Sequence, residues 1–228
     1  MGAERAGAAV RQDWARVIRE RLAGSQPQQD ISDWLVPGLW RPLEESQRRF
    51  YPREPVPAAV LMPLVERSEI TMLFTQRATG LRTHAGQTSF PGGRIEPRDG
   101  GSPKRAALRE AREEIGLEER FVSVAGYLPD HLVISGFRVT PVVSFVQPGF
   151  ELSLDTREVA DTFEVPLNYL FDPANHRRNR RRSAFTGEEV EFCEIPYGER
   201  NIWGATAGML LTLYRLCVGA DEGSTRHE

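Results

Sequence analysis

The spacing of apolar residues predicts a helix near each end of the chain and a strand-rich middle. Residues 5–22 carry apolar side chains at helical intervals, with arginine and glutamate between them, so we expect an amphipathic helix that ends near Gly24. Residues 205–218 are apolar on nearly every side, which is typical of a buried helix. Apolar and β-branched runs predict strands at 58–65, 70–76, 121–128, 133–146 and 190–197.

One segment of the middle region begins and ends like a helix. Ser102 is a favourable N-cap and Pro103 suits the first helical position, while Gly116 is typical of the residue that follows a helix. A short helix is predicted in the same way at 166–171, behind a proline. Residues 80–101 are rich in glycine and show no clean period, so we expect a structured loop. Strands followed by single helices indicate an α+β fold, with a mixed sheet covered by helices.

Length and composition are those of an ordinary globular protein. The 228 residues are 40% hydrophobic and 27% charged, which is balanced enough for a folded core. We find no internal repeat and no convincing linker. We therefore expect an N-terminal helical extension at 1–50, one domain at 51–220 and a flexible tail at 221–228.

Charge, cysteines and targeting signals narrow the class of protein. A net charge of −3 gives no general footprint for nucleic acid, so we do not expect a nucleic-acid partner. Cys193 and Cys217 form no CxxC pair, which argues against a disulfide scaffold or a structural zinc site. The first residues lack an apolar signal core, and the longest apolar stretch, at 58–65, is too short for a bilayer. These features favour a cytoplasmic protein without a membrane partner.

The central predicted helix carries three glutamates on one face. Glu110, Glu113 and Glu114 are spaced i, i+3 and i+4, so their carboxylates lie on the same side. Like charges at this spacing repel and cost helix stability unless a cation neutralises them. Mg²⁺ takes oxygen ligands and commonly bridges carboxylates to phosphates. The alternative is a solvated acidic face beside Arg109 and Arg112, which the helix alone supports equally well.

The loop and helix together resemble the Nudix box, G-x5-E-x7-R-E-U-x-E-E-x-G-U, in which U is aliphatic. Residues 109–117, REAREEIGL, match every fixed position of its second half, except that Ala111 is a small residue at an aliphatic position. In the first half the loop is two residues longer than the box, so that Gly101 or Asp99 falls where the box has Glu. Asp99 or Glu96 is the candidate substitute for that acid. The resemblance implies the Nudix fold, an α/β/α sandwich with a mixed β-sheet.

The same resemblance implies a metal-dependent hydrolase that splits a diphosphate bond. The metal ligands it implies for Mg²⁺ or Mn²⁺ are Glu110, Glu113, Glu114 and the Gly92 carbonyl. Glu110 or Glu113 would also activate the attacking water. Arg109 joins this catalytic set because an i,i+4 ion pair with Glu113 would position the carboxylates. Bound metal ions neutralise a diphosphate and lower the pKa of a bound water, which opens a stable anhydride to attack.

A second resemblance covers residues 73–93, LFTQRATGLRTHAGQTSFPGG. This segment is similar to LLTxRSxxxRxxxGxxxFPGG, the signature of the coenzyme A pyrophosphatase branch of Nudix proteins, with departures only at Phe74 and Ala78. The resemblance continues over roughly residues 55–218. It implies hydrolysis of coenzyme A or its derivatives to 3′,5′-ADP and 4′-phosphopantetheine, or its acylated form.

Polar residues in and after this signature are the candidate substrate contacts. Arg77 and Arg82 offer planar, permanently charged donors for the diphosphate and the 3′-phosphate; the alternative is that they are surface arginines. His84 and Gln87 lie in a glycine-containing loop, and a binding role and a structural role are equally open for them. Glu158 is a possible additional acid that approaches the metals from a later loop, or else an ordinary exposed glutamate.

Three interpretations of the function are therefore compared. The first is a coenzyme A hydrolase, and the second is a Nudix hydrolase of another nucleotide, such as ADP-ribose, NADH or a dinucleoside polyphosphate. The third is a noncatalytic Nudix module that binds nucleotide or RNA through the basic run at 176–182, although we expect that run to be a solvated hairpin tip. The amphipathic helix at 5–22 allows a homodimer, and packing within one chain explains its apolar face equally well.

Overall fold

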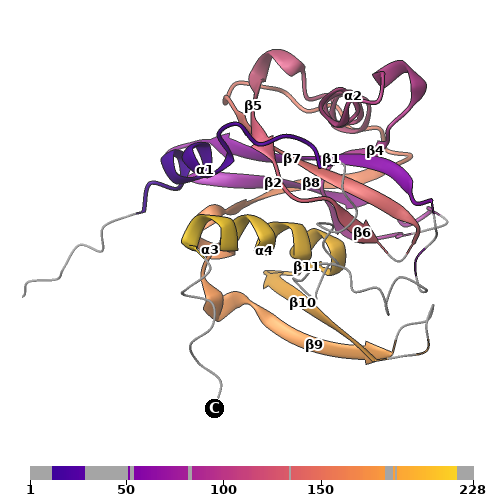
Figure 1. Ribbon diagram of the computed structural model, residues 1–228, viewed down its shortest axis with the longest axis vertical. Coiled ribbons are helices and arrows are strands. Elements are labelled where there is room, and N and C mark those ends of the chain that lie inside the picture. Colours follow the sequence, from indigo (N-terminus) through magenta and orange to yellow (C-terminus); the bar gives the residue numbers. More distant parts are fainter. Residues whose placement is uncertain are drawn as a thin grey trace, which may run out of the picture.

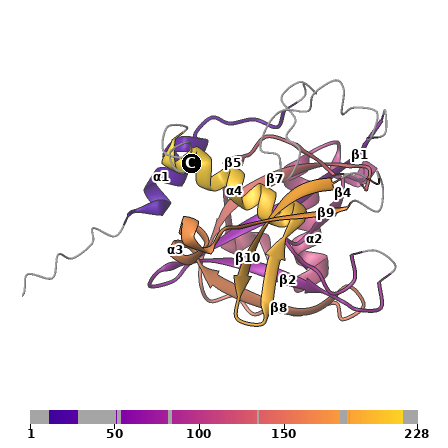
Figure 2. The same cartoon turned by 90° about the horizontal axis from the view of Figure 1, so that it is seen from below.

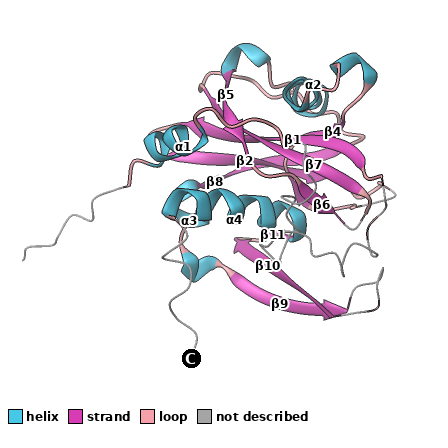
Figure 3. Ribbon diagram, in the orientation of Figure 1, coloured by secondary structure: helices cyan, strands magenta, loops and turns pink. Residues whose placement is uncertain are grey.

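A computed structural model describes residues 12–28, 54–81, 84–133, 135–182 and 189–219, together with residues 51 and 187. In this described part of the chain, eight strands form one large sheet and three form a smaller one. The helix α2 (Pro103–Ile115) covers one face of the large sheet, and α4 (Gly204–Val218) covers the other, with the smaller sheet beyond it (Figure 1). The expected α/β/α arrangement is confirmed; helices lie on both sides of the strands in Figure 3.

The large sheet is mixed, as predicted. Its central strand β1 (Val56–Glu66) runs parallel to β7 (Phe137–Val146) and antiparallel to β2 (Ile70–Arg77). The other pairs are antiparallel: β3 (Thr88–Ser89) and β8 (Val159–Pro166) with β2, β4 (Gly92–Arg94) with β1, and β5 (Val122–Tyr127) and β6 (His131–Val133) with β7. β1 pairs with β4 at residues 58–60 and with β2 only from residue 64 onward, so β2 and β4 share one edge of β1.

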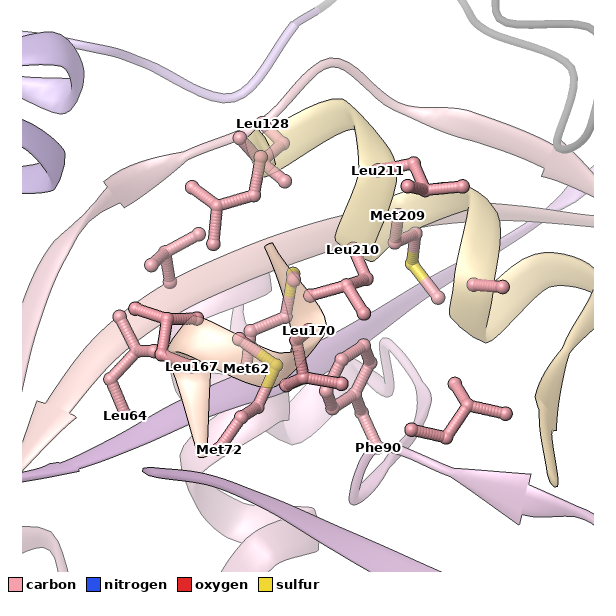
Figure 4. Packing of buried hydrophobic residues seen from close by; sticks show 14 of the residues in the cluster. Met62, Leu64, Met72, Phe90, Leu128, Leu167, Leu170, Met209, Leu210 and Leu211 are labelled. Atoms are coloured by element: carbon pink, nitrogen blue, oxygen red, sulfur yellow. The ribbon is translucent and has the colours of Figure 1, made fainter. Parts of the chain in front are cut away.

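Two apolar layers lie on the two faces of this sheet because side chains alternate along each strand. Toward α2, the strands present residues such as Ala59 and Leu61, which pack with Ala111 and Ile115 of the helix. The opposite layer joins the sheet to α3 (Leu167–Leu170) and α4, as Figure 4 shows for Met62, Leu64, Met72, Phe90, Leu167, Leu170, Met209, Leu210 and Leu211. The predicted buried helix near the C-terminus is therefore confirmed.

The predicted ends of α2 are confirmed by its caps. The Ser102 hydroxyl accepts a hydrogen bond from the Arg105 N–H at 3.3 Å, and Pro103 is the first helical residue. At the other end Gly116 adopts a left-handed φ of 72°, and its N–H donates to the carbonyls of the last turn. A Cβ on Gly116 would lie 2.9 Å from the Ser153 N, so the helix must end in glycine here. These caps fix the axial position of the glutamates along the sheet.

The N-terminal helix α1 (Trp14–Leu22) begins at the Asp13 cap, and the predicted residues before 12 lie outside the described residues. Its buried Ile18 and Leu22 belong to the same apolar layer as α4, so packing within one chain explains its apolar face. Residues 29–50 and the predicted tail at 221–228 also lie outside the described residues. Among the helices that the structure describes, none is both long and apolar enough to cross a membrane.

The structure corrects three sequence predictions. The loop expected at 80–101 contains β3, β4 and the 3₁₀-helix η3 (Pro97–Asp99). The strand expected at 133–146 begins only at Phe137 as β7, because the chain turns at Gly136, with a φ of 96°, after the short strand β6. The basic run is not a hairpin tip.

Instead, the basic run forms a strand of the smaller sheet. Strand β9 (Arg177–Arg182) pairs with β10 (Glu189–Tyr197), and β10 pairs with β11 (Arg200–Trp203). Seen from below, α4, β9 and β10 lie in front of the large sheet, while α2 lies behind it (Figure 2). Arg178 and Arg180 lie 3.5 Å and 3.6 Å from Glu191, so that carboxylate offsets part of the strand's positive charge.

Candidate active site

Two of the three predicted helix glutamates face the glycine pair of β4. Glu114 is only 4% exposed, and one of its carboxylate oxygens accepts a hydrogen bond from the Gly92 N–H at 3.2 Å. Glu110 lies against Gly93, where an added Cβ would come within 2.4 Å of the Glu110 Oε1 atom. Gly93 therefore lets the strand backbone approach the Glu110 carboxylate more closely than any other residue would allow, and Gly92 lets it pack against Ala59 and Val60 of β1.

Burial and mutual repulsion raise the pKa values of these two glutamates. Burial is the largest cause for both, and it raises the pKa of Glu114 to about 8. The charge of Glu110 adds to this increase at Glu114, and the charge of Glu158 raises the pKa of both groups. Nearby positive charge acts the other way, since Arg77 lowers the pKa of Glu114. A cation among these carboxylates would relieve the repulsion that the structure shows.

The third glutamate points elsewhere. Glu113 is 47% exposed and forms ion pairs with Arg109 at 2.9 Å and with Arg98 at 3.3 Å. The predicted i,i+4 pair between Arg109 and Glu113 is thus confirmed, whereas nothing in the sequence indicated the Arg98 pair. Within the described ranges, no three His, Cys, Asp or Glu side chains are grouped so that they could hold a metal ion. A metal-ligand role for Glu113 stays a prediction.

Arg109 is the centre of a buried network that holds the glutamates in place. Its guanidinium donates to both Asp99 oxygens, at 2.9 Å and 3.0 Å, and to Glu110 at 2.9 Å. A further N–H donates to the Arg94 carbonyl at 3.0 Å. Such fork-shaped, charge-assisted bonding fixes orientation as well as charge. Arg109 therefore ties the helix to the loop that leads into it.

Of the two acids that could replace the missing box glutamate, Asp99 is the buried partner of Arg109. Its side chain is 3% exposed, and the hydrogen bond from Arg109 lowers its pKa. Asp99 also stabilises the loop. It is the last residue of η3, and the Asp99 carboxylate accepts a hydrogen bond from the Glu96 N–H at 2.8 Å. Glu96 instead pairs with the exposed Arg98 at 2.7 Å. The sequence indicated Asp99 through the box spacing G-x5-E, which leads from Gly93 to residue 99.

Glu158, which directly precedes β8, raises the pKa of Glu110 and Glu114, and Arg77, the last residue of β2, lowers that of Glu114. The β2–β8 register shifts after Gln76, and the Ala78 N–H donates to the Glu158 carbonyl at 2.8 Å. A bulge of this kind re-aims the side chains beside it. The Arg77 Nε atom is buried and has no hydrogen-bond partner among the described residues. Beside Glu114, it is a donor available to an anion.

The remaining predicted substrate residues belong to the segment after Arg77. His84 holds a strained φ of 56°, its Nδ1 atom lies 3.0 Å from the Gln87 Oε1 atom, and the Gln87 N–H donates to the His84 carbonyl. The Gln87 carbonyl in turn accepts from the Arg77 N–H at 2.9 Å. These bonds place His84 and Gln87 next to Arg77, and no contact between them and the glutamates is seen. Arg82 lies outside the described residues.

The donor set suits a hard divalent cation. The carboxylates of Glu110 and Glu114 lie against the backbone of Gly93 and Gly92, the charge of Glu158 acts on both, and oxygen atoms are the ligands that Mg²⁺ and Mn²⁺ prefer. A bound cation would stabilise the charged forms of Glu110 and Glu114, whose pKa values are raised, and the missing Cβ at Gly93 leaves room for the Glu110 carboxylate. With Arg77 alongside, the arrangement can bind a phosphorylated ligand next to a cation.

Comparison with known proteins identifies the family of the domain. The NUDIX domain matches residues 55–185 of the 228. The uncharacterized Nudix hydrolase NudL of Cronobacter sakazakii is 39% identical over 162 residues, which cover 68% of this chain and 80% of that protein. NudL of Yersinia enterocolitica is 42% identical over 146 residues, covering 60% and 74%. The solved structure of a MutT protein from Methanosarcina mazei Go1 has 20% identity and a TM-score of 0.46, covering 72% of this chain and 95% of that one.

Nudix enzymes generally use a divalent metal ion. The domain match covers more than half of the chain, and the Cronobacter relative aligns over four-fifths of its own length. This chain therefore belongs to the Nudix family and is a pyrophosphohydrolase.

Proposed function

We propose that the protein hydrolyses the diphosphate bond of coenzyme A or a derivative, giving 3′,5′-ADP and 4′-phosphopantetheine or its acylated form. The observation that carries this proposal is Arg77. It belongs to the coenzyme A signature at 73–93, and its buried Nε atom is unpaired among the described residues, beside Glu114. A planar, permanent cation in that position suits a diphosphate.

Glu110, Glu114 and Glu158 are the proposed metal ligands, with the Gly92 carbonyl as a further oxygen. When bound, the metal would neutralise the diphosphate and make a coordinated water more acidic. Arg77 would bind a phosphate oxygen and stabilise the negative charge that develops when the bond to the leaving phosphate breaks. These roles are supported by the Gly92 contact and by the raised pKa values of Glu110 and Glu114, to which the charge of Glu158 contributes.

Glu110 is the proposed general base. It faces Gly93 and shares its surroundings with Glu114 and Glu158, whereas Glu113 is exposed and tied to two arginines. The raised pKa of Glu110 makes it a better proton acceptor than an ordinary glutamate. The water oxygen would attack phosphorus as its proton passes to the Glu110 carboxylate. Arg109, 2.9 Å from Glu110, would hold that carboxylate in place.

A substrate panel tests the proposal. The protein is incubated with Mg²⁺, and separately with Mn²⁺, in the presence of coenzyme A, an acyl derivative, ADP-ribose or NADH. Products are then separated by chromatography. We expect the highest kcat/KM for coenzyme A or its acyl derivative, with 3′,5′-ADP as one product. Cleavage of ADP-ribose while coenzyme A stays intact would refute the coenzyme A assignment. RNA binding without hydrolysis of any panel member would instead favour a noncatalytic module.

Substitution of Glu114 tests the metal assignment. Glu114→Gln keeps the shape of the side chain but removes an anionic oxygen ligand, so we expect turnover to fall about a hundredfold or more. Calorimetric titration should show weaker Mg²⁺ binding in the same variant. The matched control is Glu119→Gln, which changes an exposed glutamate beyond the end of α2. Wild-type turnover and Mg²⁺ affinity in Glu114→Gln would rule out Glu114 as a ligand.

A further inference from the structure

On the opposite face of β2 from the proposed site, Arg200 joins separate segments of the chain. Arg200 is the first residue of β11, and its Nη1 donates to the Gln76 Oε1 atom at 3.2 Å. Its Nη2 pairs with Asp161 at 2.5 Å, and its guanidinium lies over the Phe163 ring, 5.2 Å from the centroid. Arg200 lies outside the matched Nudix domain at 55–185. Three different contacts therefore hold one half-exposed arginine in a single orientation.

Gln76 connects Arg200 to the segment that carries the candidate substrate residues. The Gln76 amide nitrogen donates to the Gly86 carbonyl, and its oxygen also accepts from the Thr88 hydroxyl at 3.4 Å. The Gly86 N–H in turn donates to the Arg77 carbonyl at 3.2 Å. The Gln76 side chain therefore braces Gly86 and Thr88 against the strand residue Arg77.

Arg200 and Gly86 require the same orientation of the Gln76 amide. An arginine can only donate hydrogen bonds, so the amide oxygen of Gln76 must face Arg200. The Gly86 carbonyl can only accept, so the amide nitrogen must face Gly86. Both requirements are met by one amide orientation. Without Arg200, the amide oxygen loses its charged donor and keeps only the long bond from the Thr88 hydroxyl, so the side chain is held less firmly.

The effect of this brace passes to the active-site face through the backbone. Successive side chains of a strand point to opposite faces. Gln76 contacts Arg200 of β11, whereas the next residue, Arg77, alternates to the other face and lies close enough to Glu114 for its charge to lower the pKa of that group. Fixing the side chain of Gln76 therefore fixes the backbone from which the Arg77 guanidinium extends.

We propose that Arg200 is a positioning residue for substrate binding, acting through Gln76 on Arg77 and on residues 84–88. This inference rests on the proposed function, because it assigns Arg77 and its neighbours to the substrate. Arg200 contacts neither the glutamates nor Gly92 in any bond that the structure shows, so it does not take part in bond cleavage. Its loss raises KM and leaves kcat and the dependence on Mg²⁺ concentration nearly unchanged.

Two measurements on Arg200→Ala test this role. Hydrogen exchange should quicken at the amides of Arg77, Gly86 and Gln87, and KM should rise about tenfold while kcat changes less than about twofold, as expected for a lost charge-assisted brace. Arg200→Lys should recover part of the KM effect, because a single ammonium group reaches one acceptor but not both. The matched control is Arg180→Ala, which removes an exposed arginine from β9 and should change neither quantity.

A double-mutant cycle tests the route through Gln76. If Arg200 acts through Gln76, adding Arg200→Ala to Gln76→Ala raises KM no further. Independent, multiplying effects would overturn the proposal, and so would a fall in kcat with an unchanged KM. Should Arg200→Ala fail to fold, Asp161→Asn can be used instead, because it removes only the ion pair with Arg200. Hydrogen exchange should then quicken and KM should rise, both less than in Arg200→Ala. Wild-type exchange and KM in Asp161→Asn would also overturn the proposal. If coenzyme A is not cleaved at all, the proposed function fails, while the exchange measurement still decides whether Arg200 braces the segment.

Discussion

Replacing Asp99 by asparagine tests the buried network around Arg109 directly. Asp99 gives both carboxylate oxygens to an arginine that is itself only 14% exposed. Asparagine keeps the shape but removes the charge, and one of the two groups facing the arginine becomes an N–H donor. Removing one partner of a buried ion pair leaves the other charge poorly compensated, which typically costs 3–5 kcal/mol. Because Arg109 retains Glu110 and Glu113, we expect Asp99→Asn to lower the free energy of unfolding by about 3 kcal/mol.

The matched control is Glu96→Gln in the same loop. Glu96 is 43% exposed and pairs with an arginine that is more exposed still. Ion pairs of this kind contribute little, so the expected loss is below about 1 kcal/mol. The two variants thus separate the two acids that the sequence offered as substitutes in the Nudix box.

Urea unfolding at several pH values provides the measurement, and the m-value should stay unchanged. Interaction with Arg109 lowers the pKa of Asp99 below its ordinary 3.8, so its contribution is fully present above pH 3.8 and is lost as the pH falls through the folded value. The difference between wild type and Asp99→Asn should therefore shrink below that pH. Turnover should fall as well, because Glu110 loses part of its support. A loss in Glu96→Gln equal to that in Asp99→Asn would refute the reasoning.

Two further predictions concern Gly93 and a buried histidine. Gly93→Ala should displace Glu110, lower kcat at least about tenfold and lower the free energy of unfolding by about 1–3 kcal/mol. The control is Gly80→Ala, where a Cβ meets nothing within 4 Å and neither quantity should change. Normal kinetics in Gly93→Ala would contradict the packing argument. Burial lowers the pKa of His131 from 6.5 to about 4. Below pH 6.5 the unfolded chain therefore takes up a proton on this histidine that the folded chain does not. The free energy of unfolding should fall for this reason by about 1.4 kcal/mol per pH unit between pH 6.5 and 4, with the full contribution of His131 present above pH 6.5. His131→Gln should remove this component from the pH dependence of unfolding; an unchanged slope would show that His131 does not titrate as assigned.

The secondary structure that could be predicted from the sequence is the part that local interactions determine. The caps of α2, Ser102 and Gly116, act on backbone groups within the same helix, and their positions were predicted correctly. The same holds for Glu110 and Glu114, which the helical repeat places toward the same strand. The short strands β3 and β4 were missed, because two or three residues carry no readable period and become strands only by pairing with β2 and β1.

The candidate site likewise contains residues that the local sequence predicted and residues whose position only the tertiary structure decided. Sequence alone predicted Glu110, Glu114, Arg109 and the glycine pair, but it left Asp99 and Glu96 as alternatives. Which acid is buried depends on how η3 folds the loop back onto the helix. The outward direction of Glu113 likewise depends on Arg98, an ordinary loop arginine with no distinguishing pattern.

The sequence by itself determined that this protein is a Nudix hydrolase with a row of carboxylates on one helix, because helical spacing and a contiguous motif act over a few residues. Only the tertiary structure brought Arg77 and Glu158 to those carboxylates, through the register of β2 with β8. Only the tertiary structure placed Arg200 behind Gln76 as well. Strand pairing joins residues that are remote in the chain, and a one-residue change of register would turn each side chain to the other face of the sheet.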